Sequence, residues 1–185
     1  SAQGDYMGYP HLLLKGNHMY EPLIRVPLIV KYPGQLQAGS VSDALVNTID
    51  CAPTLLRQAG CDVPAVMPGL DLADAPQRPL VFAESGRGRS YMVRSPTHKL
   101  LFCQDDTHSQ YFDLARDPHE LQNLYREPAH QRDIADMKTA LANWALFDAP
   151  YPVHTDEGAP IISAANAQQH NAESRDEIYA YFEGK

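Results

Sequence analysis

The sequence predicts an α/β fold, in which the edge of one sheet is followed by a small antiparallel sheet packed on a C-terminal helix. Three observations support this prediction. An almost wholly apolar run, residues 23–30, has the composition of a buried strand. Short strand-like runs joined by short links then occupy residues 79–114. Apolar residues finally recur at helical spacing over residues 129–147.

Length and composition limit the classes of protein that fit. The 185 residues suffice for one domain or slightly more, and the apolar content is that of an ordinary globular protein. A net charge of −8 argues against a nucleic-acid partner, because phosphate binding needs basic patches. No apolar run approaches the roughly 18 residues of a membrane span. Three cysteines without a CxxC pair do not form a disulfide framework.

The first expected element is the strand over residues 23–30, which ends at the turn signal Tyr32-Pro33-Gly34. A strand that is apolar on both faces requires covering layers above and below it. Arg25 lies inside this run, and a buried charge must be matched. We therefore expect Arg25 to form an ion pair, with Glu21 as the candidate partner.

A helix is expected next, beginning near Thr48 or Asp50 and stopping at Gly60. Pro53 is compatible with this helix in the first turn, where no amide donor is needed. Its expected apolar face consists of Ala52, Leu55, Leu56 and Ala59.

Four strands are expected after this helix, at residues 79–84, 90–94, 99–103 and 110–114. The short links between them favour antiparallel pairing. Asp117, Pro118 and Glu120 then have the pattern of a capping box, with the aspartate as N-cap. The helix over residues 129–147 should cover the sheet with the stripe Ile134, Met137, Leu141 and Trp144.

The opening residues carry a longer and more specific pattern. It comprises Ser1, Gly4-Asp5, Gly8, Leu12, Lys15, Met19-Tyr20-Glu21 and the run from Ile24 to Val30. This pattern resembles the sulfatase branch of the alkaline-phosphatase-like hydrolases, and the resemblance continues to Phe147. It implies that residues 1–78 are the C-terminal edge of a sulfatase-type α/β domain. Residues 79–150 would then be a small sheet-plus-helix subdomain, and residues 151–185 an extended tail.

The resemblance implies that Lys15 contacts the sulfate ester and balances charge as the S–O bond breaks. A lysine ammonium is a compact point charge that suits an oxyanion. His11 and His18 flank this lysine and are candidate substrate-binding residues, as proton donor or anion grip. The alternative interpretation is that all three are ordinary polar side chains of a surface loop.

The family also implies a calcium ion and a formylglycine nucleophile, and we expect neither in this chain by itself. Where the family has metal-binding Asp and His or Asn, this sequence has Ala2 and Gln3. The family pattern has a second Asp-His pair, and the aligned positions in this sequence are Tyr9 and Pro10. Calcium needs several carboxylate or carbonyl oxygens, so we assign no metal ligand.

Cys51 superficially fits the nucleophile motif C-x-P-S-R of the family. No arginine follows Thr54, and the family's nucleophile lies far upstream of this region. The surrounding sequence instead resembles the structural family segment V-x-x-x-D-x-A-P-T-L-L. We therefore expect Cys51 to be a structural thiol.

The expected activity of the parent enzyme is hydrolysis of a sulfuric ester, either a small molecule or a glycan. Two alternatives stay open: a related phosphonate or phosphate diester hydrolase, and a non-catalytic remnant that acts as a binding or oligomerisation module. Ala2 and Gln3 favour the remnant, whereas Lys15 favours the enzyme. Since the run at residues 23–30 lacks sheet neighbours in this chain, its unpaired edge also predicts a homo-oligomer.

Overall fold

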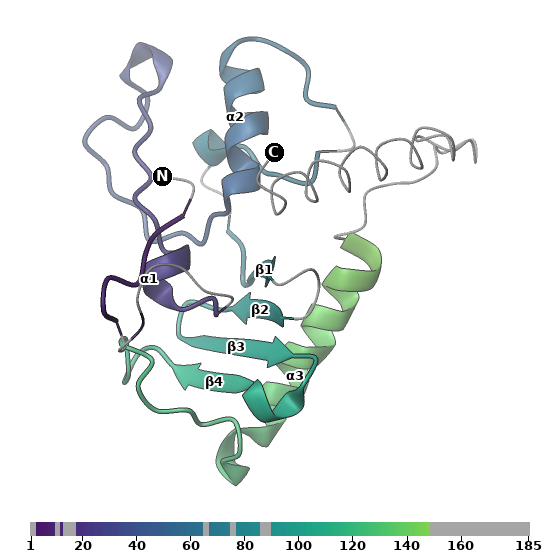
Figure 1. Ribbon diagram of the computed structural model, residues 1–185. Coiled ribbons are helices and arrows are strands. Elements are labelled where there is room, and N and C mark those ends of the chain that lie inside the picture. The colour runs from purple at the N-terminus through teal and green to yellow at the C-terminus, as the bar shows by residue number, and fades with distance from the viewer. Residues whose placement is uncertain are drawn as a thin grey trace, which may run out of the picture. The chain divides into compact units, whose positions relative to one another are not determined.

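The computed structural model of the protein describes residues 3–9, 12, 18–64, 67–74, 77–85 and 90–148. The chain divides into two units between Asp148 and Ala149, and all the described residues belong to the first unit. The predicted tail, residues 151–185, lies outside the described residues. The regular elements are α1 (Glu21–Ile24), α2 (Cys51–Gln58), β1 (Val81–Ser85), β2 (Ser90–Arg94), β3 (His98–Cys103), β4 (Gln110–Asp113) and α3 (Gln131–Asn143) (Figure 1).

Short 3₁₀ turns and one π turn complete the described secondary structure. They occupy Pro33–Gln35, Thr48–Asp50, Leu72–Asp74, Asp106–His108, Pro128–His130 and, as the π turn, Trp144–Asp148. None of the helices in the described part of the chain has the length and apolar character needed to cross a bilayer.

The four strands form one antiparallel sheet in the order β1-β2-β3-β4. Consecutive strands are neighbours, and Val93 pairs with Leu100, which in turn pairs with Tyr111. The predicted small antiparallel sheet is therefore confirmed, with its strands at nearly the predicted positions.

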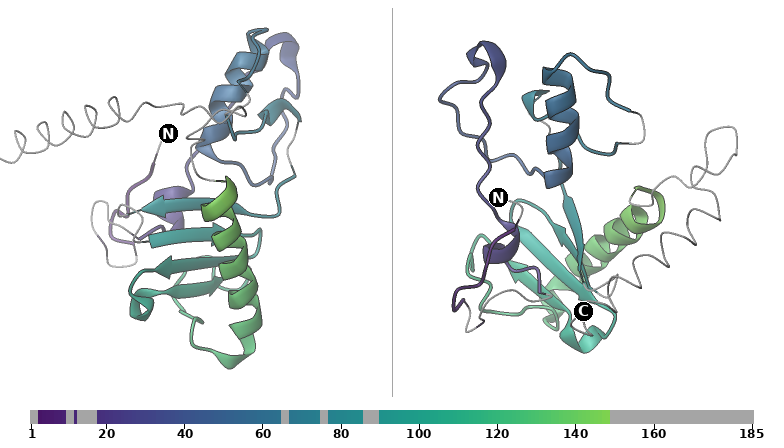
Figure 2. Two further views of the ribbon diagram at one scale, coloured as in Figure 1. Left: turned by 90° about the vertical axis from the view of Figure 1, so that its right-hand side faces the viewer. Right: turned by 45° about the horizontal axis from the view of Figure 1, so that its top comes forward.

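Helix α3 covers one face of this sheet (Figure 2). Val93, Leu100 and Tyr111 are fully buried on that face, against Ile134 and Leu141 of the helix. Each buried aliphatic side chain of this size stabilises the fold by about 1.5–3 kcal/mol. The predicted stripe is confirmed, and its partly buried members at the rim are Met137 and Trp144.

The N-terminal segment covers the opposite face of the sheet. Its buried side chains are Tyr6, Met19 and Tyr20, and the sheet side chains beneath them are Met92, Leu101 and Phe112. Gly4 fixes this segment close to α1, since its amide donates to the Leu23 carbonyl over 2.8 Å. A Cβ at Gly4 would lie 1.9 Å from the Pro22 carbonyl oxygen, so the close approach requires glycine.

The predicted strand over residues 23–30 was wrong. Helix α1 takes up its first residues, and the remainder is extended without a paired strand among the described residues. Leu28, Ile29 and Val30 are 47%, 93% and 42% exposed. The composition suits a strand, but a strand also needs a neighbour for its backbone groups. Pro27, moreover, has no amide to donate.

Helix α2 begins at Cys51, so Pro53 lies in its first turn as predicted. Gly60 follows the helix with a φ of 74°, which confirms it as the C-terminal stop. The predicted apolar face was wrong, because Leu55 is exposed, whereas Pro53 and Thr54 are the buried residues of the helix. The Thr54 hydroxyl donates to the Asp50 carbonyl oxygen and accepts from the Leu72 amide, and these bonds favour burial of the helix face that carries Thr54.

The predicted capping box was also wrong. Residues 118–121 form no helix, and the Asp117 carboxylate accepts a hydrogen bond from the amide of Gln122. Glu120 adopts a φ of 51° and points its side chain inward, where it meets Lys99. A buried lysine requires a matched carboxylate, and this need takes precedence over the local cap.

Candidate functional site

Of the three predicted site residues, the structure describes His18, whereas His11 and Lys15 lie outside the described residues. His18 is exposed and immediately precedes the buried pair Met19 and Tyr20. His18 therefore lies at the boundary between solvent and the buried residues Met19 and Tyr20.

Two contacts hold His18. The hydroxyl of Tyr6 donates a hydrogen bond to the His18 carbonyl oxygen. The imidazole ring stacks on the ring of Tyr20, with centroids 5.7 Å apart and an interplanar angle of 29°. Burial raises the pKa of Tyr6 to about 12, so its hydroxyl remains a donor at neutral pH. Both the backbone and the ring of His18 are thus fixed to buried tyrosines.

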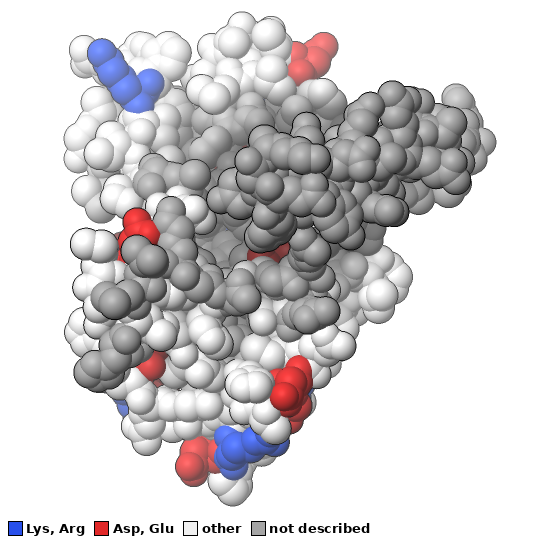
Figure 3. Space-filling model, viewed as in Figure 1, with Lys and Arg blue, Asp and Glu red and all other residues white. Residues whose placement is uncertain are grey.

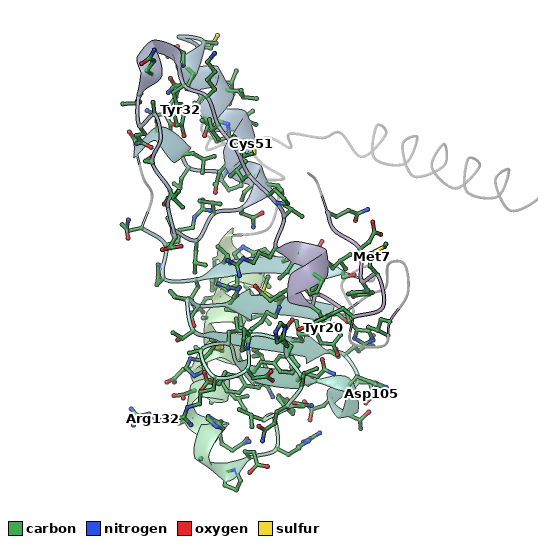
Figure 4. The ribbon with its side chains drawn as sticks, turned by 90° about the vertical axis from the view of Figure 1, so that its left-hand side faces the viewer. Met7, Tyr20, Tyr32, Cys51, Asp105 and Arg132 are labelled. Atoms are coloured by element: carbon green, nitrogen blue, oxygen red, sulfur yellow. The ribbon has the colours of Figure 1, made fainter. Side chains whose placement is uncertain are left out.

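Tyr20 is itself locked into the core. Its ring meets Tyr6 edge-on at 6.2 Å between centroids and Phe112 of β4 at 6.1 Å. Figure 4 shows Tyr20 between α1 and the sheet. Edge-to-face pairs of this kind stabilise beyond the area they bury, by about 0.5–1.5 kcal/mol each.

Glu21, the next residue, belongs to a network of buried and partly buried charges that we call the Glu21 network: Glu21, Arg94, Lys99 and Glu120. Lys99 donates to Oε1 of Glu21 over 3.0 Å and lies 2.5 Å from Oε1 of Glu120. The guanidinium of Arg94 donates to both oxygens of Glu21, over 3.0 and 3.3 Å. The Glu21 amide donates to Oε2 of Glu120 over 2.6 Å.

The carboxylates of the Glu21 network respond differently to burial. Burial raises the pKa of Glu21, but the adjacent Lys99 and Arg94 outweigh this effect and hold the pKa below its usual range. For Glu120 burial dominates and raises the pKa, although Lys99 lies beside it. Both Lys99 and Glu120 are fully buried. Glu21 is therefore the firmly ionised carboxylate to which both cations are bound.

The predicted Arg25–Glu21 ion pair was wrong. Arg25 is exposed, and Glu21 is paired with Lys99 and Arg94 instead. A surface pocket of about 320 Å³ opens beside the network, where Glu21, Arg25, Asp43 and Arg94 share its wall. The charged side chains on the face shown in Figure 3 are scattered over the described part of the molecule.

A second buried carboxylate, Asp50, organises the start of α2. Arg78 binds both of its oxygens, over 2.5 and 2.6 Å, and the amides of Asn47 and Leu70 donate to them over 2.8 Å each. The hydroxyl of Thr54 bridges the Asp50 carbonyl and the Leu72 amide. These bonds give the segment around Cys51 a structural role, as the sequence predicted.

The described residues offer no calcium site. Among them no three His, Cys, Asp or Glu side chains gather as metal ligands would. Gln3 and Asp5 are both exposed, and Ala2 lies outside the described residues.

Sequence reasoning missed Lys99, Arg94 and Glu120. Both faces of β3 are buried, so strict alternation does not mark Lys99 as an inward residue. One signal of a buried ion pair was present in the sequence: Lys99 directly precedes the apolar run Leu100–Cys103. Its partner Glu120 was instead attributed to a capping box.

Comparison with known proteins gives a consistent result. Residues 11–78 match the family model described as N-sulphoglucosamine sulphohydrolase, C-terminal. The N-acetylglucosamine-6-O-sulfatase of Bacteroides thetaiotaomicron is 32% identical over 158 residues, which cover 76% of this chain and 28% of that protein. The chain thus spans less than a third of this relative's length.

Solved structures agree. A 2-O GAG sulfatase has a TM-score of 0.67 and 27% identity, over 77% of this chain and 34% of that one. A protein solved in complex with its substrate D-glucosamine-2-N,6-O-disulfate has a TM-score of 0.67 and 28% identity, over 76% and 32%. The phosphonate monoester hydrolase of Agrobacterium radiobacter has a TM-score of 0.65 over 84% and 36%, and its 20% identity shows a shared fold alone.

Proposed function

This chain belongs to the sulfatase family of the alkaline-phosphatase-like superfamily, matching its C-terminal portion, and from that premise we propose that it takes part in hydrolysing sulfuric esters. The observation that carries the proposal is the match of residues 11–78 to a sulphohydrolase C-terminal model, because that match includes His11, Lys15 and His18. These are the residues that we propose to contact the sulfate ester.

Lys15 is the proposed catalytic residue. Its ammonium would meet the negative charge that develops on the ester oxygens as the S–O bond breaks. His18 is a proposed substrate-binding residue, and its placement suits that role, since an exposed ring fixed to Tyr20 can meet a ligand without losing much freedom. His11 is the second proposed substrate-binding residue.

We propose that the chain by itself does not turn over a sulfate ester. The calcium ion and formylglycine of the parent family would be supplied by sequence other than these 185 residues, since Ala2 and Gln3 offer no carboxylate. When bound, calcium would neutralise sulfate charge, and formylglycine would supply the nucleophile. The residues of this chain would hold and orient the ester.

The substrate class we propose is a sulfated small molecule or glycan. The relatives named above support a glycan, since one is an N-acetylglucosamine-6-O-sulfatase and another binds a glucosamine disulfate. We also propose that the chain forms homo-oligomers. Support comes from the exposed apolar side chains Leu28, Ile29 and Val30 on an extended, unpaired segment.

The non-catalytic remnant is the second candidate, favoured by Ala2 and Gln3. The phosphonate hydrolase shares the fold and supplies no separate argument for its activity here.

One experiment distinguishes the enzyme from the remnant. The protein is captured from its own cells with an antibody against this chain, and turnover of 4-nitrophenyl sulfate is assayed with and without calcium. The mass of its single polypeptide is then measured under denaturing conditions, which separate the subunits of any oligomer. A polypeptide mass well above 20.6 kDa with calcium-dependent turnover supports the sulfatase. A polypeptide mass near 20.6 kDa without turnover overturns it in favour of the remnant.

A further inference from the structure

We propose that Glu21 is a positioning residue through which the small sheet fixes the orientation of His18. This inference rests on the proposed function, because it takes His18 as a residue that meets the sulfate ester. Glu21 would act through its neighbour Tyr20, on whose ring His18 stacks. Arg94, Lys99 and Glu120 would then be positioning residues one step further from the ester.

Glu21 is held at two places that together define its orientation. Its carboxylate receives charged hydrogen bonds from Lys99 of β3 and Arg94 of β2. Its backbone amide is bound by the Glu120 carboxylate from the loop after β4. Hydrogen bonds to ionised groups are short, directional and about twice as strong as neutral ones. Glu21 therefore cannot rotate without breaking bonds to three separate parts of the sheet subdomain.

The fixed backbone at Glu21 determines where Tyr20 lies. The Tyr20 ring fills the space between Tyr6 and Phe112, with an edge toward each. Apolar packing by itself tolerates small slips along the sheet, because dispersion contacts are many and weak. The charged bonds one residue away remove that freedom, so the outer surface of the Tyr20 ring becomes a defined platform.

His18 occupies this platform from the solvent side. Its ring stacks on Tyr20, and its carbonyl accepts the hydroxyl hydrogen bond of Tyr6. The chain of contacts from Lys99 to Glu21, Tyr20 and His18 is continuous, and it passes from a fully buried cation to an exposed imidazole. Substrate-binding groups must be held by such a supporting layer to keep a productive geometry.

The test is an NMR measurement on the full chain with ¹³C-labelled histidine, in which the His18 ring signal is assigned by its loss in His18→Gln. The aromatic ring of Tyr20 should displace this signal from the position of an unstructured histidine. In Glu21→Gln we expect the signal to move toward that unstructured position. Amide exchange at Met19 and Tyr20 should become faster by about tenfold or more, because local opening costs less.

Asp50→Asn is the matched control, since it also neutralises a buried carboxylate bound by an arginine, in a different part of the fold. It should leave the His18 signal in place. Equal displacement in both variants would overturn the proposal, because general destabilisation would then explain it. An unmoved His18 signal in Glu21→Gln would overturn it as well.

A second variant is used if Glu21→Gln does not fold. Arg94→Gln removes one of the two cations bound to Glu21 and keeps Lys99 in place. It should displace the His18 signal in the same direction by a smaller amount. An unchanged signal in this folded variant would overturn the proposal.

Addition of inorganic sulfate to the wild-type chain tests the proposed function separately. Movement of the His18 signal with sulfate supports a role in holding the ester. A His18 signal that does not move with sulfate but still shifts in Glu21→Gln would overturn the substrate-binding role of His18 and leave the positioning effect of Glu21 intact. A signal that responds to sulfate but not to Glu21→Gln would overturn the positioning effect alone.

Discussion

The ammonium of Lys99 and the carboxylate of Glu21 lie 3.0 Å apart, although 78 positions separate them in the sequence. This pair joins the N-terminal segment to β3. Lys99 also meets Glu120 on its other side, so this buried ammonium lies between two carboxylates. The two halves of the described chain are thus tied by a charged contact as well as by apolar packing.

Replacing Lys99 with methionine should therefore destabilise the fold strongly. Methionine keeps most of the volume but leaves the buried Glu120 without its cation, and breaking a buried pair in this way costs about 3–5 kcal/mol. Urea unfolding followed by circular dichroism measures the loss. Lys138→Met is the control, because Lys138 is partly exposed beside Asp106 and should cost about 1 kcal/mol or less. Equal losses in both variants would contradict the prediction.

The acid stability of the protein should depend on Asp50. Burial raises the pKa of this carboxyl, but Arg78 and the amides of Asn47 and Leu70 outweigh it and hold the pKa below its usual range. Because the folded pKa lies below the unfolded one, the stabilisation is complete above about pH 4 and is lost as pH falls through the folded value.

Asp50→Asn should consequently be less stable than wild type at pH 7, with a gap that narrows below about pH 4. Unfolding free energies measured at several pH values check this, with the exposed Asp136→Asn as control. A gap of the same size at pH 7 and pH 3 would show that the Asp50 charge is not what stabilises the fold.

Self-association, if it uses the extended segment, should depend on Ile29. This side chain is 93% exposed, and a lysine there would charge the segment that edge pairing would cover. We expect Ile29→Lys to lower the mass of the assembly toward the monomer in a light-scattering dilution series. Val41→Lys, at a residue 95% exposed elsewhere on the chain, should not. A wild-type monomer at every concentration would refute the oligomer.

Lys15→Ala should lower kcat/KM for a sulfate ester by about 10²–10³-fold in the active enzyme, as for removal of a group that stabilises developing charge. Most of this loss should appear in kcat, because the contact strengthens in the transition state. Lys31→Ala, at an exposed lysine, is the control and should keep wild-type rates. Similar losses for both lysines would mean that general positive charge, and not a contact by Lys15, assists the reaction.

The small sheet and α3 could be predicted from sequence because their signals are local. Short β-type runs, tight links and the spacing of Ile134 and Leu141 can be recognised in the sequence without knowledge of the rest of the fold. Pro53 and Gly60 likewise mark α2 through their own backbone restrictions. The conformation of residues 23–30 was predicted wrongly, because strand formation depends on a pairing neighbour that local composition does not reveal.

For the candidate site, the family resemblance named Lys15 and its flanking histidines, and their role stays a prediction. The Glu21 network was not predicted, because it joins four residues from separate elements. Glu120 was assigned to a local cap, and Arg25 was expected to pair with Glu21. Both errors arise because the partner of a charge is decided by the fold and not by sequence proximity.

The two faces of the sheet also differ in the order in which they can form. Strands β1 to β4 and α3 follow one another directly along the chain, so their contacts close short loops at low entropic cost. Tyr6 and Tyr20, by contrast, reach Phe112 across most of the described sequence. The sheet and α3 can thus assemble first, with the N-terminal segment docking late. Weakening that late contact would then speed unfolding while leaving the folding rate largely unchanged.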